Sequence, residues 1–257
     1  MWTRERKLEA CQRAPLVRAI RRRDTRIVER PGWYQVITPS APPHVLNEVA
    51  FSQVDEADVE RTIDEVIAEY AAAGQPVKWC VGPWTRPRDL GERLAKRGFR
   101  VTRTRGMVCE TSLELGPPST VAIEEVREEN LDDYLRGMMR GWSFPEDQLA
   151  VERASHLEAM RATERVAYFF VARSMDEVLG TAWLVDRGDY GYLVGAQVLE
   201  HARGRGLYRA LMAARLTHLR ERGIGLAVTQ AREATSAPIL EKLGLDTVFR
   251  SECWFST

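Results

Sequence analysis

The residues best suited to chemistry lie in one segment, residues 196–212, where an apolar strand runs through a turn rich in glycine and arginine into a helix. The first N–H groups of a helix lack intrahelical acceptors and carry a partial positive charge. Gly204 and Gly206 leave the backbone free to approach a phosphate closely. Arg203 and Arg205 add guanidinium groups whose planar geometry suits phosphate oxygens. These residues predict a binding site for a pyrophosphate.

The spacing excludes two better-known phosphate motifs. The segment does not contain the Gly-x-x-x-x-Gly-Lys-Ser/Thr of a P-loop, and the third glycine of a dinucleotide fingerprint is missing. Several predicted strands also precede the turn, where a Rossmann unit would begin. The simpler interpretation is a tight strand-to-helix turn with two solvated arginines, and the turn taken by itself does not decide against it.

Composition adds a few constraints. Lys+Arg and Asp+Glu number 37 each, so the zero net charge gives no global electrostatic reason to bind nucleic acid or a membrane. The cysteines form no Cys-x-x-Cys pair and have no His cluster beside them, which predicts no metal site and is typical of reduced thiols in a cytoplasmic protein. The longest uncharged apolar run, Val166–Ala172, is far shorter than the ~20 residues of a membrane span. With no signal-peptide core at residue 1 onward, we expect a cytoplasmic location.

In residues 1–30, ten basic residues outnumber four acidic ones. A contact with RNA or the ribosome is one interpretation. The other, which we favour, is a solvated helix, because Leu8, Cys11, Leu16 and Ile20 give the segment a partial apolar stripe. Nucleic acid is therefore not an expected partner.

Hydrophobic periodicity predicts the remaining elements of the first half. Val59, Ile63, Val66 and Tyr70 recur at spacings of three and four, as in an amphipathic helix. The other expected elements are strands at 33–38, 45–51 and 77–81, a short helix at 87–96 and an extended segment at 99–115.

The sequence Gly116-Pro117-Pro118-Ser119 is the clearest linker and predicts domains at 1–116 and 117–257. The expected elements after it are strands at 121–126, 166–173, 178–186, 192–199, 226–231 and 247–255, with a polar turn at 174–177, and helices at 130–141, 144–164, 206–222 and 237–243. The two halves end alike. Leu94–Phe99 parallels Leu240–Leu245, and Val77–Val81 parallels Leu226–Gln230, which predicts a duplicated α/β unit.

In these features the chain resembles the GNAT superfamily of N-acetyltransferases over roughly residues 120–257. The turn resembles the family signature Arg/Gln-x-x-Gly-x-Gly/Ala, with Arg203 and Gly206 at its first and fourth positions and Tyr208 where Gly or Ala is usual. Residues 237–245 resemble the second cofactor motif of the family. The resemblance implies an α/β (α+β) fold with two GNAT-like mixed-sheet domains in tandem. The first domain looks like a degenerate copy, as in the mycothiol synthase type.

The resemblance also implies the ligands and where they bind. Acetyl-CoA, or another acyl-CoA, would be the co-substrate, and a primary amine on a small molecule, peptide or protein would be the acceptor. The thioester would lie in a gap between residues 195–199 and 228–231. Ser236 and its neighbour Thr235 stand near a position that often contacts the pantetheine or leaving group, although a helix N-cap is their simpler role. The residues implied in cofactor binding are Gln197, Val198, Leu199, Arg203, Gly204, Arg205, Gly206, Leu207, Tyr208, Arg209 and Ser236.

Direct attack of an amine on a thioester needs a base, a donor to the oxyanion and a proton for the leaving thiolate. The Val198 amide is a candidate oxyanion donor. Glu200 is the candidate base, with His201 beside it, and both are also typical of an exposed loop. The tyrosine acid of many relatives corresponds to Leu240, so Tyr208 is the candidate acid. Tyr192 and Cys253 are the other possible donors.

The first half lacks a matching phosphate turn, because Ser52–Asp58 contains no glycine and three acidic residues. We expect this half to bind no CoA and either to complete the acceptor pocket or to serve as a scaffold. Trp79 and Trp84 are candidates for an interface between the halves or for ordinary core packing. The acceptor pocket is expected along Gly141–Arg161, where the candidate lining residues are Trp142, Phe144 and His156.

Three functions follow as hypotheses. The first is an N-acyltransferase that uses acyl-CoA. The second is a non-catalytic acyl-CoA sensor or structural protein, favoured by Leu240 and by the degenerate first half. The third is an RNA-associated acetyltransferase, which only residues 1–30 support. The sequence does not fix the oligomeric state, and a homodimer is compatible with it.

Overall fold

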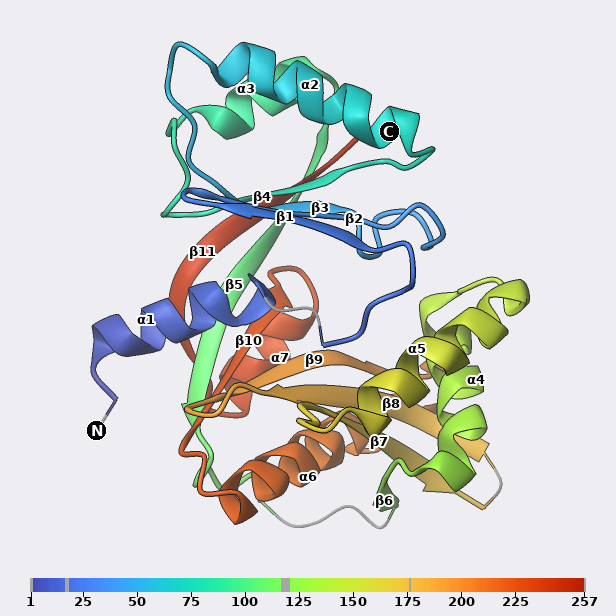
Figure 1. Ribbon diagram of the computed structural model, residues 1–257. Helices are drawn as coiled ribbons and strands as arrows, with labels where there is room; N and C mark the ends of the chain where they lie inside the picture. The colour runs from blue at the N-terminus through green and yellow to red at the C-terminus, as the bar shows by residue number, and fades with distance from the viewer. Residues whose placement is uncertain (1, 17–18, 117–120, 176, 257) are drawn as a thin grey trace.

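The computed structural model describes residues 2–16, 19–116, 121–175 and 177–256. Pro117, Pro118 and Ser119 of the predicted linker, and Asp176 of the predicted polar turn, lie outside these residues. Figure 1 shows an upper unit with α2 and α3 on its sheet and a lower unit around α6, joined by long strands. In the described part of the chain, no helix has both the length and the apolar composition that crossing a membrane requires.

The N-terminal half follows the predicted order of strands and helices from residue 33 onward. Its elements are α1 (Arg4–Arg13), the 3-10 helix η1 (Ala14–Leu16), β1 (Arg26–Arg30), β2 (Trp33–Ile37), β3 (Glu48–Ser52), α2 (Val59–Ala72), β4 (Lys78–Val81), α3 (Leu90–Lys96) and β5 (Arg100–Glu110). The helix expected within residues 1–30 is confirmed only as α1. The prediction missed β1, because the sequence Arg-Ile-Val-Glu-Arg reads as part of the charged segment, whereas it forms a largely exposed strand at the edge of the sheet.

The C-terminal half matches its predicted elements closely. These are β6 (Ala122–Glu125), η2 (Glu128–Asn130), α4 (Leu131–Trp142), η3 (Glu146–Gln148), α5 (Leu149–Arg161), β7 (Ala167–Ser174), β8 (Glu177–Asp186), β9 (Gly191–Val198), η4 (Glu200–Ala202), α6 (Leu207–Glu221), β10 (Leu226–Arg232), α7 (Ser236–Lys242) and β11 (Asp246–Phe255).

All of the named strands belong to one mixed sheet, in the order β1-β2-β3-β4-β11-β5-β10-β9-β8-β7-β6. Each half of the sequence inserts its last strand beside the other half: β11 pairs with β4, β5 pairs with β10, and β5 and β11 pair with each other. Figure 1 shows β5 and β11 running between the upper and lower units. The two expected units are therefore present, but they share a single sheet through exchanged final strands.

The predicted repeat is visible in the backbone. In each half a parallel strand pair, β3–β4 or β9–β10, flanks a helix crossover. α3 ends with the N–H of Phe99 donating to the carbonyl of Leu94, and α7 ends with the N–H of Leu245 donating to the carbonyl of Leu240. Gly98 and Gly244, with φ of 82° and 98°, form the left-handed caps of these two helices. The next strands, β5 and β11, then pair antiparallel at the centre of the sheet.

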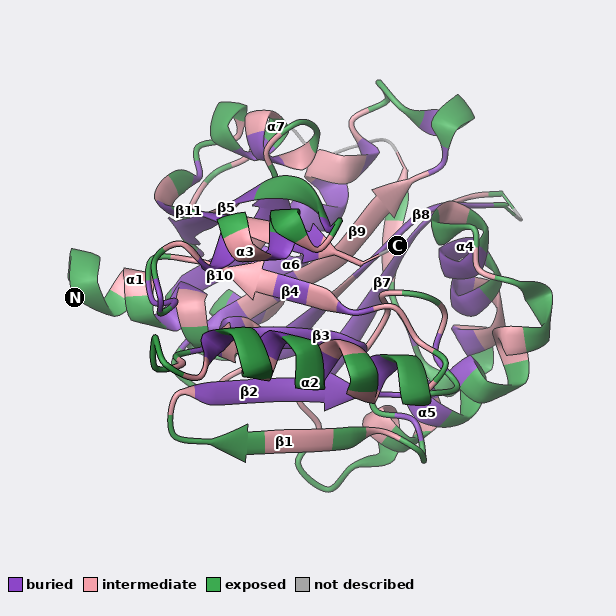
Figure 2. Cartoon of the chain, turned by 90° about the horizontal axis from the view of Figure 1, so that it is seen from above, coloured by how far each residue is buried: buried purple, intermediate pink, exposed green. Residues whose placement is uncertain are grey.

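Helices cover both faces of the sheet in the C-terminal half, so β7 is buried on both sides. In β7, Tyr168 and Phe170 pack against α6 on one face, while Phe169 and Val171 pack against α4 on the other. In the upper unit, one face of α2 lies on the sheet and the opposite face is exposed, as Figure 2 shows in alternating purple and green. The cofactor helix α6 and the helices of the expected acceptor side, α4 and α5, therefore lie on opposite faces of the sheet.

The two candidate interface tryptophans both belong to the core. Trp79 is fully buried, packs edge-on against Trp33 and donates from its indole N–H to Ser52. Trp84 packs between Phe51 of the N-terminal half and Phe249 of β11, so it lies where the two halves meet. α1 covers this junction with the buried Cys11, whose thiol donates to the carbonyl of Thr229.

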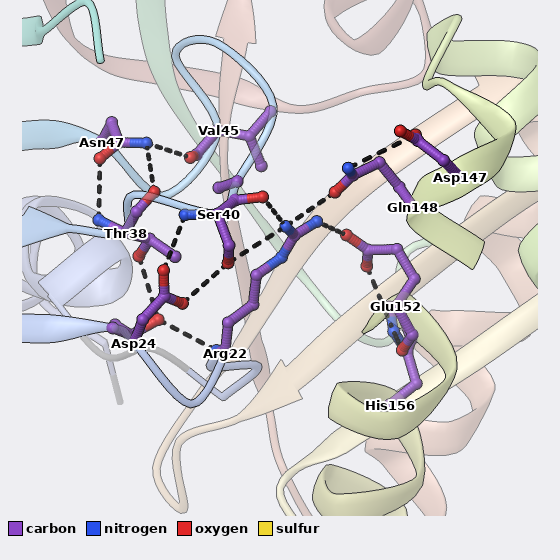
Figure 3. Close-up of polar contacts among 12 residues, drawn as sticks. Arg22, Asp24, Thr38, Ser40, Val45, Asn47, Asp147, Gln148, Glu152 and His156 are labelled. Carbon is purple, nitrogen blue, oxygen red and sulfur yellow. Dashed lines mark hydrogen bonds and ion pairs between the residues drawn. The ribbon is translucent and has the colours of Figure 1, made fainter. Parts of the chain in front are cut away.

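A buried ion pair ties the N-terminal half to α5 (Figure 3). The guanidinium of Arg22 bonds the carboxylate of Glu152 at 2.5 Å and the amide oxygen of Gln148 at 2.9 Å, and it also donates to the carbonyl of Ser40. The side chains of Arg22 and Glu152 are 2% and 9% exposed. Arg22, a basic residue of the charge-skewed segment, thus holds the two halves together, and it is not available for nucleic acid.

This network makes a prediction about stability. Replacing Glu152 with Ala leaves the Arg22 charge buried without a carboxylate, so the free energy of unfolding should fall by about 3–5 kcal/mol. The measurement is urea-induced unfolding. Glu158→Ala, at an exposed position of the same helix, is the matched control and should change stability by no more than about 0.5 kcal/mol. Equal losses in the two variants would contradict the role given to the ion pair.

Candidate functional site

The parallel strands β9 and β10 separate soon after they meet. They pair only at Gly191–Ala227 and Tyr192–Val228, and beyond these pairs a cavity of about 200 Å³ opens between them. It overlaps the gap expected between residues 195–199 and 228–231 at residues 195, 196 and 229–231, whereas Gln197, Val198, Leu199 and Val228 do not line it. Its lining residues are Trp142, Tyr192, Leu193, Val194, Gly195, Ala196, Tyr208, Met212, Arg215, Thr229, Gln230, Ala231, Arg232, Thr235, Ser236 and Leu240.

A bulge in β9 produces the separation. The register between β8 and β9 shifts between Thr181 and Trp183, opposite Gly195, which has a left-handed backbone with φ of 57°. A Cβ on Gly195 would lie 2.3 Å from the indole nitrogen of Trp183, so only glycine fits there. On the β10 side of the gap, the hydroxyl of Thr229 donates to the carbonyl of Leu193 at 2.8 Å. This bond satisfies a carbonyl that lies beyond the last pair of the β9–β10 ladder. An isolated glycine inside a predicted strand was the available signal for this bulge.

Of the three strand residues implied in pantetheine binding, Val198 turns its backbone to the gap. The N–H of Leu199 donates to the carbonyl of Leu179 in β8. Because alternate residues of a strand face opposite neighbours, the N–H and C=O of Val198 point away from β8. The side-chain amide of Gln197 donates to the carbonyl of Gly137 in α4 and to the hydroxyl of Thr181 in β8. Val198 is therefore the residue of this group best placed to bond an extended ligand.

The predicted phosphate turn has the backbone of an anion site. Gly204 and Gly206 have φ of 77° and 75°, and Gly206 is the N-cap of α6 without any side-chain cap. The first backbone bond at this end of α6 runs from the N–H of Ala210 to the carbonyl of Gly206. Within the described part of the chain, the N–H groups from Gly204 to Arg209 have no protein acceptor. A run of unpaired N–H groups at a helix N-terminus fits a diphosphate.

The arginines of the turn strengthen this site. Arg203 and Arg205 are exposed, and Arg203 donates to the carbonyl of Val198. The guanidinium of Arg209 lies over the turn, since a Cβ placed on Gly206 would be 3.7 Å from it. None of these three arginines forms an ion pair with a described acidic residue. Their charges are available to a phosphate.

Tyr208 is the candidate catalytic residue that reaches the cavity. It lies in the first turn of α6 and lines the gap between the strands. Burial raises the pKa of its phenol above the usual value, and the nearby Arg215 lowers it to a lesser degree. Tyr208 therefore holds its proton at neutral pH. Tyr192 also lines the cavity, whereas Cys253 lies in β11 beside Cys80 and away from it.

Glu200 and His201 lie outside the cavity. Both are exposed residues of η4, and the imidazole of His201 lies 3.3 Å from the carboxylate of Glu177. None of the described residues that line the cavity is Asp, Glu or His. Glu200 thus stays a candidate base that would act from the solvent side of the gap.

The second cofactor motif contributes α7 to the wall of the gap. Leu240 is buried and lines the cavity, so an apolar side chain stands at the position of the usual tyrosine. Ser236 accepts a hydrogen bond from the N–H of Arg232 at 2.9 Å and also faces the cavity. Thr235 is the N-cap residue of α7, without a side-chain capping bond.

The expected acceptor side separates into lining and core residues. Trp142, at the end of α4, lines the cavity with Arg232 stacked 6.0 Å from its ring centre. Phe144 packs against the α4 cluster. His156 is buried between Tyr134 and Phe169 and bonds the carbonyl of Glu152, and burial lowers its pKa. His156 is therefore a core histidine and does not line the gap.

The equivalent turn of the N-terminal half has the opposite charge. Asp58 is the N-cap of α2, and Glu56 and Glu60 near it are bound by Arg93. These carboxylates occupy the position at which α6 presents free N–H groups and arginines. Elsewhere among the described residues, no cluster of His, Cys, Asp and Glu is suited to a metal ion.

Comparisons with known proteins agree with this geometry. The sequence profile of the acetyltransferase (GNAT) family matches residues 123–245. A GCN5-related N-acetyltransferase from Kribbella flavida superposes with a TM-score of 0.69 at 16% identity, covering 100% of this chain and 96% of that chain. A conserved protein of unknown function from Staphylococcus epidermidis gives 0.68 at 13% identity, covering 92% and 94%. A tandem GNAT protein from the clavulanic acid biosynthesis pathway gives 0.57 at 15% identity, covering 92% and 84%. No curated protein matches the chain.

The bulge makes a second stability prediction. Gly195→Ala forces both a left-handed backbone on alanine and a Cβ into Trp183. It should destabilise the protein by about 1–3 kcal/mol more than Gly188→Ala. Gly188 is the matched control, because its φ is 78° and nothing lies within 4 Å of the added Cβ. Thermal and urea unfolding of both variants measure the difference. Equal destabilisation would mean that Trp183 does not press on Gly195.

Proposed function

We propose that this chain, whose residues 123–245 match the GNAT family profile and whose two-unit fold resembles that of tandem GNAT proteins, transfers an acyl group from coenzyme A to a primary amine. The observation that carries this proposal is the run of unpaired N–H groups from Gly204 to Arg209, which opens beside the gap between β9 and β10. A diphosphate at the turn and a thioester in the gap are joined in CoA by one extended arm. Tyr208 belongs to the turn and also lines the gap, so the two sites adjoin, as that molecule requires.

Binding is assigned to three groups of the chain. The N–H groups of the turn, with Arg203, Arg205 and Arg209, hold the diphosphate. The backbone of Val198 bonds the pantetheine arm or the carbonyl that becomes the oxyanion. The side chains of Leu193, Ala196 and Leu240 exclude water from the acyl end.

Proton transfer is assigned to two side chains. Tyr208 keeps its proton at neutral pH and stands in the gap, so it is the proposed acid for the leaving thiolate. The attacking amine must lose its proton, and Glu200 is the proposed acceptor at the solvent side of the gap. Because Glu200 is exposed, we expect it to contribute little to the rate. Most amine molecules then lose their proton to the bulk solvent.

A second function has one observation in its favour. The absence of Asp, Glu and His from the described lining of the cavity is compatible with a protein that binds acyl-CoA without turning it over. Thiol release from acetyl-CoA with a panel of amines separates the two functions. Release above the buffer rate supports the transferase, whereas tight CoA binding without release from any amine supports the sensor.

The binding site is tested with Gly206→Glu, which adds a Cβ and a negative charge at the turn. We expect the Kd of CoA, measured by isothermal titration calorimetry, to rise about 100-fold, or ~2.7 kcal/mol. Gly223→Glu is the control, because Gly223 ends the same helix with nearly the same φ, 74°, in open space. Its Kd should stay within about twofold of wild type. Unchanged binding by Gly206→Glu would remove the proposed diphosphate site.

The acid is tested with Tyr208→Phe, which keeps the ring and removes only the hydroxyl. The value of kcat should fall about 100-fold with little change in the KM of acyl-CoA. Because burial raises the pKa of Tyr208, its protonated form persists through pH 9. The wild-type rate should therefore rise from pH 7 to pH 9 with the fraction of free amine, without an alkaline decline. A decline in that window, or full activity of Tyr208→Phe, would show that another group protonates the thiolate.

A further inference from the structure

Arg215 is a fully buried cation that has no acidic partner among the residues that the structure describes. It lies in α6 and is 2% exposed. Its Nε donates to the carbonyl of Leu211 at 3.0 Å, one terminal nitrogen donates to the carbonyl of Trp183 at 3.3 Å, and the other meets only the sulfur of Met212 at 3.9 Å. Sulfur is a weak acceptor, so much of the donor capacity of this guanidinium is unused.

The contrast with Arg22 shows how unusual this is. Arg22 is similarly buried, but it bonds the carboxylate of Glu152 and oxygens of Ser40 and Gln148. No described Asp or Glu pairs with Arg215 in this way. A buried charge without a counter-ion is strongly destabilising, and proteins rarely keep one that has no use.

The ionisable neighbours of Arg215 do not neutralise it. They are Tyr208 and Cys109. Burial raises the pKa of the Cys109 thiol to about 12 and the pKa of Tyr208 above its usual value, so both groups are neutral at pH 7. Burial lowers the pKa of Arg215 to about 10, which still leaves the guanidinium charged at pH 7. The described residues therefore give this positive charge no counter-ion, and a bound anion would supply one.

Arg215 is placed where the acyl group would end. It lines the cavity between β9 and β10, and its bond to Trp183 puts the guanidinium level with Val194, at the start of the bulge. About nine residues of helix, or ~13 Å, separate it from the diphosphate turn at Gly206. The cavity is also lined by the cation Arg232, and none of its described lining residues is acidic. Its charge thus suits an anion.

We propose that the acyl donor is a dicarboxylic acid monothioester of CoA, of the succinyl class, whose distal carboxylate pairs with Arg215. This inference rests on the proposed acyl transfer. A cavity of about 200 Å³ exceeds the ~150 Å³ that admits a benzene molecule, so a four-carbon acyl chain fits. A carboxylate on the amine acceptor is an alternative partner for Arg215, because its charge is the same. However, Arg215 lies in α6, which covers the face of the sheet opposite α4 and α5, although Trp142 at the end of α4 reaches the same cavity.

The reaction is balanced without any further reagent. The ammonium group first gives one proton to Glu200 or the solvent. The amine nitrogen then forms a bond to the thioester carbonyl carbon, the carbon–sulfur bond breaks, and the second proton lost by the nitrogen is matched by the one that the thiolate gains. The distal carboxylate is unchanged. The product is an amide with a free carboxylate, which turns a cationic amine into an anionic group.

The test compares succinyl-CoA with butyryl-CoA, which has the same chain length and no distal carboxylate. We expect wild-type protein to bind succinyl-CoA at least tenfold more tightly by calorimetry and to show at least a tenfold higher kcat/KM with it across an amine panel. In Arg215→Met this preference should disappear. Met nearly matches the length of the side chain and removes an uncompensated charge, so the variant should fold with an unchanged or higher Tm. Arg220→Met, exposed on the same helix and outside the cavity, should keep the preference.

The outcomes separate this inference from the proposed function. Equal binding of the two thioesters by wild-type protein overturns the role of Arg215 and leaves acyl transfer in place. Failure to bind CoA itself overturns both. If the carboxylate matters only on the amine, so that Arg215→Met loses discrimination between an amino acid and its amide, the pairing belongs to the acceptor and the acyl assignment is wrong. The comparison in wild-type protein needs no variant to fold.

Discussion

The separation of β9 from β10 is the constraint on which the site depends. Adjacent parallel strands ordinarily satisfy each other's N–H and C=O groups along their whole length. Here the ladder stops after Tyr192 and Val228, and the bulge at Gly195 turns β9 away from its neighbour. Backbone N–H groups beyond the break, including that of Val198, are left for a ligand. The same divergence opens the cavity that α6 closes from below with Tyr208, Met212 and Arg215.

The exchanged strands give this break a rigid frame. β10 cannot close the gap by shifting towards β9, because β5 of the N-terminal half pairs with it along its whole length. β11 continues the pairing to β4 and ties the second unit to the first. In the N-terminal half, the turn that corresponds to the phosphate turn carries acidic residues. This half still contributes to the site, because its strand β5 fixes one wall of the gap.

Much of this arrangement could be predicted from the sequence, and the parts that could not have physical causes. The turn at Gly204 and Gly206 is local, so residue types and spacing identify it without any tertiary information. The repeat around Gly98 and Gly244 is local in the same way. β5 and β11 are similar strands, and each pairs with a strand of the other half. No local pattern in the sequence distinguishes this pairing from pairing within the same half. Arg215 reads as a solvated residue on a helix with mixed faces, and only the packing of α6 against β8 and β9 makes it a buried charge in the cavity.

The most direct test of the central claim is amide hydrogen exchange, followed by mass spectrometry, with and without CoA. Binding of the coenzyme should slow exchange in peptides covering residues 196–212, because the free N–H groups of the turn and of Val198 acquire acceptors. Peptides covering residues 50–62, the equivalent segment of the N-terminal half, should not change. Binding of CoA with protection in the N-terminal segment, or with none in residues 196–212, would contradict a site built on the unpaired backbone between β9 and α6.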